Sequence, residues 1–200
     1  MARKFGKPEI NIKDMEKKNQ QLNKKIDFLL KYFPARIKNV GENAVAAREL
    51  IWGFKDCVQG VDIKVAEMIA RRIVEEYGSQ LENLVLACVP TSKKSDYVSR
   101  FKLFSEKVCE VAGIENGFAH VVIMKSRPAV HEHRRGKNKC DVAPSIVDYD
   151  TKFFKGKNVL VFDDVITTGS SFSTFATQLE EIGANVVGGM FLGKTFYKYS

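Results

Sequence analysis

The stretch Val159-Leu-Val-Phe-Asp-Asp-Val-Ile-Thr-Thr-Gly-Ser-Ser171 (VLVFDDVITTGSS) decides the fold. Its four apolar residues predict a buried strand, and two acids stand where that strand should end. The polar residues 167–171 lead into residues 170–182, whose apolar spacing predicts a helix. Because ligands of open α/β sheets bind beyond the carboxyl ends of strands, this strand–turn–helix unit predicts a binding site.

The turn at residues 167–171 has the features of a phosphate site. It offers hydroxyl groups, backbone N–H groups around Gly169 and the positive end of the following helix. Asp163 and Asp164 would repel a polyphosphate, but they suit two neighbouring sugar hydroxyls, and a phosphate with a vicinal diol describes a ribose 5-phosphate. The alternative is ordinary turn chemistry, in which aspartates cap a loop and Thr, Ser and Gly favour turns. The fixed order of acids, hydroxyl-rich turn and helix favours the binding site.

The rest of the chain alternates helices and strands around this unit. Apolar spacing predicts helices over residues 14–33, 44–54, 63–77 and 95–111. Short apolar runs predict strands over residues 84–90, 120–124, 158–162 and 185–191. Residues 125–150 are polar and without period, which indicates a long loop. The alternation from residue 84 onward predicts an α/β fold with a parallel sheet covered on both faces.

A second stretch, GGMFLGKT at residues 188–195, satisfies the phosphate-loop pattern G-x-x-x-x-G-K-[ST]. A phosphate loop needs a following helix, whose N-terminus binds the phosphate. Only residues 196–200 follow this stretch, and the acidic strand that could hold magnesium precedes it. We therefore expect the match to be a coincidence and exclude a nucleotidase of this class.

Composition and charge limit the classes of protein to which the chain can belong. The 200 residues are 44% hydrophobic and 28% charged, which is enough for one good-sized core. The net charge of +8 is concentrated in residues 1–38, at +7, and residues 125–140, at +5. Such basic segments are more often solvated surface, although the N-terminal arm could contact nucleic acid. We expect no membrane span and no signal peptide, and hence a cytoplasmic protein. The four cysteines are scattered, which favours buried thiols over disulfides or zinc.

Residues 159–171 match, at every position, the phosphoribosyl diphosphate (PRPP) signature of type I phosphoribosyltransferases. The wider chain resembles the ComF-like branch of that family, in which a strand ending in Val-Pro precedes a basic segment containing Arg-Phe. Here that segment is Val89-Pro-Thr-Ser-Lys-Lys-Ser-Asp-Tyr-Val-Ser-Arg-Phe101. The resemblance covers roughly residues 50–195. It implies a parallel sheet of about five strands with flanking helices in residues 51–200, preceded by an N-terminal helical arm or cap in residues 1–50.

The resemblance also implies roles for individual residues. Asp163 and Asp164 would bind the ribose hydroxyls, and Thr167, Thr168, Gly169, Ser170 and Ser171 would bind the 5-phosphate. The loop formed by Thr91, Ser92, Lys93 and Lys94 would bind pyrophosphate, although a solvated lysine pair is equally expected there. Residues 127–148 would form a mobile loop that closes over PRPP and excludes water, with Arg134, Arg135 and Lys137 neutralising the leaving group. Magnesium would arrive bound to the pyrophosphate, with few or no direct protein ligands.

The reaction implied is transfer of the phosphoribosyl group from PRPP to a nitrogen acceptor, with release of pyrophosphate. Two alternatives to an enzyme stay open. The first is a PRPP-sensing regulator that contacts nucleic acid through its basic arm. The second is a ComF-like partner protein in DNA uptake or recombination. His131, Glu132, His133 and Cys140 resemble a metal cluster, but their irregular spacing argues against one. A catalytic base at His131 or His133 also stays open. The acceptor and the oligomeric state are not predicted.

Overall fold

The computed structural model describes residues 12–125 and 146–198. It has a five-stranded parallel sheet in the order β1-β7-β6-β2-β3. The strands are β1 (Lys25–Tyr32), β2 (Leu84–Cys88), β3 (Glu115–Asn116), β6 (Asn158–Ile166) and β7 (Asn185–Thr195). The predicted fold class, an α/β parallel sheet of five strands with flanking helices, is thereby confirmed.

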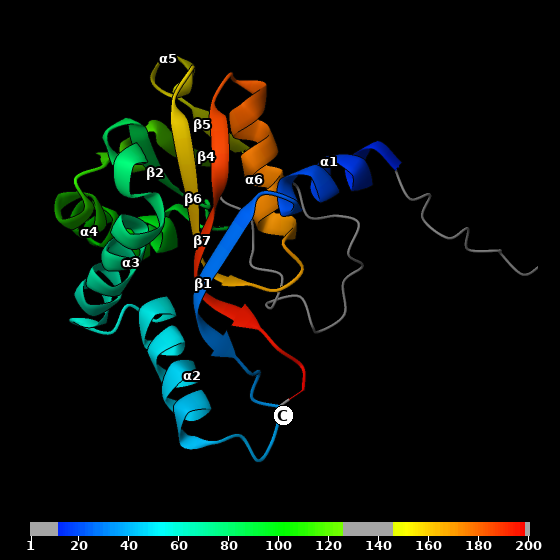
Figure 1. The fold of residues 1–200 in the computed structure, drawn as a ribbon, viewed down its shortest axis with the longest axis vertical. Coiled ribbons are helices and arrows are strands. Elements are labelled where there is room, and N and C mark those ends of the chain that lie inside the picture. Colours follow the sequence, from blue (N-terminus) through cyan, green and yellow to red (C-terminus); the bar gives the residue numbers. More distant parts are fainter. Residues whose placement is uncertain (1–11, 126–145, 199–200) are drawn as a thin grey trace, which may run out of the picture.

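Helices cover both faces of this sheet. They are α1 (Ile12–Leu22), α2 (Glu42–Lys55), α3 (Val61–Tyr77), α4 (Lys94–Ala112), α5 (Thr151–Phe154) and α6 (Ser170–Glu181). Figure 1 shows α3 and α4 on one side of the sheet, α1 and α6 on the other, and α2 beyond the arrowheads of β1 and β7. Short 3-10 helices η1 (Gly78–Asn83) and η2 (Phe118–His120) precede β2 and β4. No described helix is long and apolar enough to cross a membrane.

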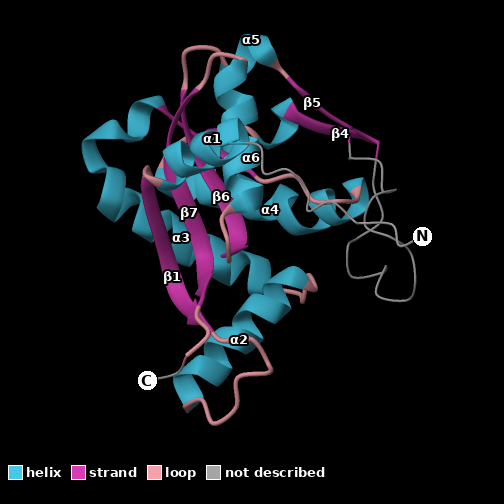
Figure 2. Ribbon diagram, turned by 90° about the vertical axis from the view of Figure 1, so that its right-hand side faces the viewer, coloured by secondary structure: helices cyan, strands magenta, loops and turns pink. Residues whose placement is uncertain are grey.

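Two strands form a separate antiparallel ribbon, β4 (Val121–Lys125) with β5 (Ile146–Tyr149). Figure 2 shows this ribbon standing apart from the main sheet. The predicted strand at 120–124 therefore exists, but it does not belong to the parallel sheet. The prediction of a continuous loop over 125–150 was wrong for residues 146–149. These four residues alternate between exposed and half-buried positions, and so short and half-polar a strand gives little sequence signal.

The first strand, β1, lies where the sequence predicted the second half of a helix. The helix predicted over residues 14–33 ends at Leu22, and Lys25–Tyr32 instead pairs in parallel with β7. Its apolar residues fit a helical spacing, but pairing with a central strand overrides local preference. Hydrogen bonding to β7 places this segment in the main sheet. The division of the chain into an arm of residues 1–50 and a domain of residues 51–200 stays a prediction.

An aromatic cluster fixes β6 against the helices on one face of the sheet. Phe54 of α2, Phe101 and Phe104 of α4 and Phe162 of β6 are all buried, and their ring centroids lie 4.4–6.3 Å apart. Aromatic pairs at such separations stabilise a core beyond the area that they bury. Phe162 directly precedes the two acids of the signature, so this packing holds the carboxyl end of β6 in place.

The stretch GGMFLGKT lies entirely within β7, and the described residues after it form no helix. Its glycines have packing roles instead. A Cβ on Gly188 would collide with the backbone oxygen of Lys25 on β1, and a Cβ on Gly193 would lie 2.6 Å from Cδ1 of Ile51. The phosphate-loop pattern is therefore a by-product of a crowded central strand, as expected from the sequence.

Gly188→Ala should destabilise the fold. The added methyl meets rigid backbone of β1, and overpacking of this kind typically costs about 1–3 kcal/mol. Urea unfolding of purified variants measures the change. The matched control is Gly53→Ala in α2, where the new Cβ lies 3.4 Å from its nearest neighbour and alanine improves helix propensity. If Gly188→Ala unfolds at the same urea concentration as the unsubstituted protein, the close β1–β7 approach is not a packing constraint.

Candidate functional site

A tight turn joins β6 to α6 at Gly169. Gly169 has a left-handed backbone conformation, with φ 72° and ψ 9°, and it occupies the N-cap position of α6. The N–H of Ser173 donates to the carbonyl of Gly169 at 2.9 Å, which is the first hydrogen bond of the helix. The N–H groups of the preceding helical residues therefore have no partner within the helix. Glycine is the residue that tolerates this conformation, and the turn presents unpaired donors at the positive helix end.

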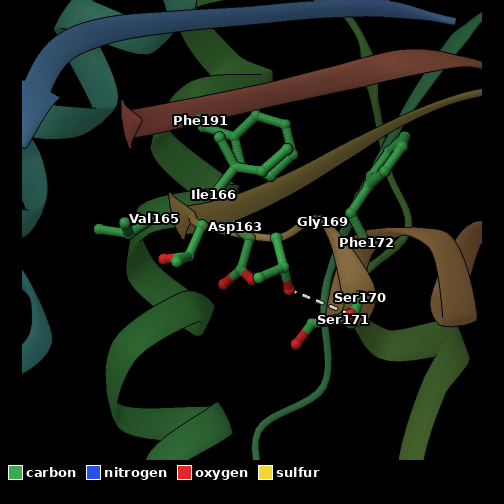
Figure 3. Close-up of a pocket in the computed structure, with 10 residues that line it drawn as sticks. Asp163, Val165, Ile166, Gly169, Ser170, Ser171, Phe172 and Phe191 are labelled. Carbon is green, nitrogen blue, oxygen red and sulfur yellow. Dashed lines mark hydrogen bonds between the residues drawn. The ribbon is translucent and has the colours of Figure 1, made fainter. Parts of the chain in front are cut away.

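This turn and the end of β6 enclose a pocket of about 130 Å³. Ten residues line it, namely Asp163, Val165, Ile166, Thr167, Thr168, Gly169, Ser170, Ser171, Phe172 and Phe191. Figure 3 shows the Asp163 carboxyl and the hydroxyls of Ser170 and Ser171 in this region. The hydroxyl groups of Thr168 and Ser170 lie 3.0 Å apart, and those of Thr167 and Thr195 lie 2.8 Å apart. All five turn residues of the predicted phosphate site thus come together with one of the two predicted acids.

The two acids of the signature have different surroundings. Asp163 is half-buried and lines the pocket, whereas Asp164 is 6% exposed and faces two cations. Nη1 of Arg100 donates to Oδ2 of Asp164 at 3.0 Å, and Nζ of Lys55 lies 3.5 Å from Oδ1. Consecutive side chains of a strand point to opposite faces, which accounts for the difference. Asp163 is therefore the acid positioned for a ligand in this pocket.

Sequence reasoning missed the partners of Asp164. Arg100 lies on α4, and its Nη2 also donates to the carbonyl of Lys55 at 3.1 Å, so it ties the end of α2 to β6. A buried carboxylate needs such compensation, because burying an unpaired charge is expensive. The Arg-Phe pair at residues 100 and 101 was noted as part of a basic segment. Nothing in the sequence connects it to an acid 64 residues away.

Burial raises the pKa of the Asp163 carboxyl, and the negative charge of Asp164 raises it further. The Asp164 N–H, which donates to Oδ1 of Asp163 at 2.9 Å, and the cations Lys55 and Arg100 act in the opposite direction. A pocket carboxyl whose charged form is disfavoured gains from hydrogen-bond donors supplied by a ligand. Sugar hydroxyls are donors of that type.

The predicted pyrophosphate loop lies beside this pocket. Its residues Thr91, Ser92, Lys93 and Lys94 follow β2, the strand that pairs in parallel with β6. The Val89 N–H donates to the Phe162 carbonyl at 2.8 Å, so the loop after β2 begins opposite Phe162, the residue before Asp163. The Thr91 hydroxyl donates to the carbonyl of Lys93, the N-cap residue of α4, at 2.7 Å. The structure thus brings the two predicted binding loops to adjacent strand ends.

Other predicted site residues cannot be placed. Arg134, Arg135 and Lys137 lie outside the described residues, as do His131, Glu132, His133 and Cys140. β4 and β5 flank the segment that contains all seven. Within residues 12–125 and 146–198, no group of three or more His, Cys, Asp or Glu residues could hold a metal ion.

Comparison with solved structures finds similar enzymes of phosphoribosyl chemistry. Adenine phosphoribosyltransferase from Saccharomyces cerevisiae is 15% identical, with 68% of this chain and 70% of that chain covered and a TM-score of 0.46. A hypoxanthine-guanine phosphoribosyltransferase from Bacillus anthracis is 13% identical over 70% of this chain and 72% of that chain, with a TM-score of 0.39. Phosphoribosylpyrophosphate synthetase from Mycobacterium smegmatis is 19% identical over 64% and 33%, with a TM-score of 0.37.

The sequence matches no protein-family model and no curated protein. The ComF-like branch suggested by the sequence is not confirmed by these comparisons. Because the structural similarities have low identities and TM-scores below 0.5, the functional proposal rests on the residues of the site.

Asp163→Asn should stabilise the protein, and the gain should grow with pH. The raised pKa means that the folded state favours the protonated carboxyl. That contribution to stability is fully present below the ordinary carboxyl pKa of about 4 and is lost as pH rises through the raised value. Asparagine retains an oxygen that can accept from the Asp164 N–H. Because it does not ionise, it never acquires the unfavourable buried negative charge. Urea unfolding from acidic to neutral pH measures the difference, with Glu82→Gln on η1 as control. A stability difference that stays constant with pH would contradict this account.

Proposed function

We propose that the protein binds PRPP and transfers its 5-phosphoribosyl group to a nitrogen acceptor, with release of pyrophosphate. The main support for this proposal is that Asp163 shares a pocket with residues 167–171 at the start of α6. A carboxylate beside an anion site is unfavourable for a bare polyphosphate. It suits a ligand whose phosphate is separated from its hydroxyl donors by a short carbon skeleton, as in a pentose 5-phosphate.

In this proposal the 5-phosphate binds at the turn. The N–H groups of Ser170 and Ser171, which precede the first hydrogen bond of α6, donate to its oxygens together with the Thr and Ser hydroxyls. The sugar hydroxyls donate to Asp163. Asp164 supports the site indirectly, because its ion pairs with Arg100 and Lys55 hold the end of β6 against α2 and α4. The pyrophosphate extends toward Thr91, Ser92, Lys93 and Lys94 at the end of β2.

The reaction breaks the bond between C1 of the ribose and the pyrophosphate oxygen, and the leaving pyrophosphate keeps the electron pair. A bond forms between C1 and the acceptor nitrogen, which then loses a proton. The transition state has oxocarbenium character, so the protein acts mainly by orienting the reactants and stabilising the leaving group. Arg134, Arg135 and Lys137 are proposed for the second task. Two of these are arginines, whose planar guanidinium group suits phosphate oxygens.

Magnesium is the metal implied for such a substrate. Asp163 provides carboxylate oxygens at the pocket, and Mg²⁺ prefers oxygen ligands and is commonly bound through substrate phosphates with few protein ligands. The described residues therefore fit a Mg²⁺ ion that enters on the pyrophosphate. When bound, the ion would neutralise part of the pyrophosphate charge. A cytoplasmic location and a contact between nucleic acid and the N-terminal arm stay predictions from the sequence.

The unsubstituted protein should bind PRPP with magnesium, and Asp163→Asn should weaken this binding about 10- to 100-fold. The reason is the loss of charge-assisted hydrogen bonds to the sugar, worth about 1.5–3 kcal/mol. Titration calorimetry measures the affinity. The control is Glu82→Gln, an exposed residue on η1, which lies at the opposite, amino-terminal end of β2. Equal PRPP affinity in Asp163→Asn and the unsubstituted protein would rule out this pocket as the sugar site.

Turnover separates the proposed enzyme from a PRPP-sensing regulator or a non-catalytic partner protein. We expect pyrophosphate release when PRPP and magnesium are supplied with one of a panel of purine, pyrimidine and amine acceptors. Binding of PRPP without release for any acceptor would favour the regulator.

A further inference from the structure

The N-terminal helix α1 packs against α6 through several polar contacts. Nζ of Lys17 lies 2.8 Å from Oε1 of Glu181, and Glu180 accepts from Gln21 and from Lys24, which lies just after α1. Lys24 also donates to the carbonyl of Val186 on β7 at 2.6 Å. Gln21 is 2% exposed. Figure 1 shows α1 beside α6. These contacts hold α1 at a defined position on the helix that begins at the phosphate-binding turn.

One face of α1 reaches the turn itself. The ammonium group of Lys18 donates to the hydroxyl oxygen of Ser170 at 2.9 Å. Leu22, one helical turn further on, packs so closely on Gly169 that a Cβ at that glycine would collide with its side chain. Lys18 and Leu22 are four residues apart and therefore share a face of the helix. Hence α1 covers the turn with an apolar side chain next to a cation.

The charges around the pocket indicate a function for the ammonium group of Lys18. None of the ten lining residues carries a positive charge, and Asp163 is the one acidic residue among them. A phosphate bound there would be stabilised further by a positive charge in addition to the α6 dipole. Lys17 and Lys24 have carboxylate partners on α6, whereas Lys18 donates to a neutral hydroxyl on the pocket wall.

We propose that Lys18 is a further binding residue for the 5-phosphate of a pentose phosphate. The inference rests on the proposed function and adds a residue from outside the predicted phosphoribosyltransferase domain. When the Ser170 hydroxyl donates to a phosphate oxygen at about 2.7 Å, the Lys18 ammonium group, 2.9 Å from that hydroxyl, is close enough to bind the same phosphate. An ammonium group has three donors, so Lys18 can contact both Ser170 and the phosphate.

This arrangement also assigns a role to the N-terminal segment. Residues 12–22 would complete the phosphate site by covering the turn, with Lys18 next to Ser170 and Leu22 excluding water next to Gly169. A cation at this position favours a phosphorylated sugar over the free sugar, because only the former has a charge for it to bind. Selectivity for the 5-phosphate is therefore the property that depends on Lys18.

The test compares two neighbouring lysines of α1. Lys18→Ala should weaken binding of PRPP with magnesium and of ribose 5-phosphate about tenfold, which corresponds to about 1.4 kcal/mol. It should leave the affinity for pyrophosphate with magnesium unchanged, because that group binds at the other end of the site. Lys18→Arg should recover most of the affinity. Lys17→Ala is the matched control, since it removes an ion pair between the same two helices without removing a charge from the turn. Urea unfolding shows whether each variant is folded.

The outcomes separate this inference from the proposed function. If the unsubstituted protein binds neither PRPP nor ribose 5-phosphate, the proposed function fails and the inference falls with it. If the protein binds both but Lys18→Ala binds them equally well, the inference alone is overturned. Equal weakening by Lys17→Ala and Lys18→Ala would also overturn it, because α1 would then act only by packing on α6.

Discussion

The left-handed conformation of Gly169 is the constraint on which the rest of the site depends. It turns the chain sharply enough for α6 to begin four residues after the end of β6, and it leaves the first N–H groups of that helix unpaired. The absence of a side chain at Gly169 also makes room for Leu22 of α1. One backbone position therefore determines the donors of the pocket, the start of α6 and the docking of a helix that is distant in the sequence.

The two acids that precede this turn have different surroundings, because adjacent side chains of a strand point to opposite faces of the sheet. Asp164 points to the face covered by α2 and α4, where Arg100 and Lys55 compensate its buried charge. Asp163 lies in the pocket, where burial and its neighbour raise the pKa of its carboxyl. A ligand with hydroxyl donors relieves that unfavourable charge. We therefore propose that Asp164 is a structural acid and Asp163 the binding acid, although the sequence alone suggests two equivalent ones.

Local chemistry explains which features could be predicted from the sequence. The β6–turn–α6 unit was predictable because strand, turn and helix cap are contiguous in residues 158–181 and each has its own residue preferences. The strand Lys25–Tyr32 was not, because its apolar spacing also fits a helix and only pairing with β7 decides between them. The contact of Arg100 with Asp164 and the role proposed for Lys18 depend on contacts across 64 and 152 residues, and no local pattern encodes such contacts.

The central claim is that the turn at Gly169 binds the phosphate of a pentose 5-phosphate whose hydroxyls face Asp163. A crystal structure of the protein with ribose 5-phosphate tests it most directly. We expect the phosphate oxygens within about 3 Å of the backbone nitrogens of Ser170 and Ser171 and the sugar hydroxyls within the same distance of the Asp163 carboxylate. A sugar phosphate bound elsewhere on the molecule, with this turn empty, would contradict the account.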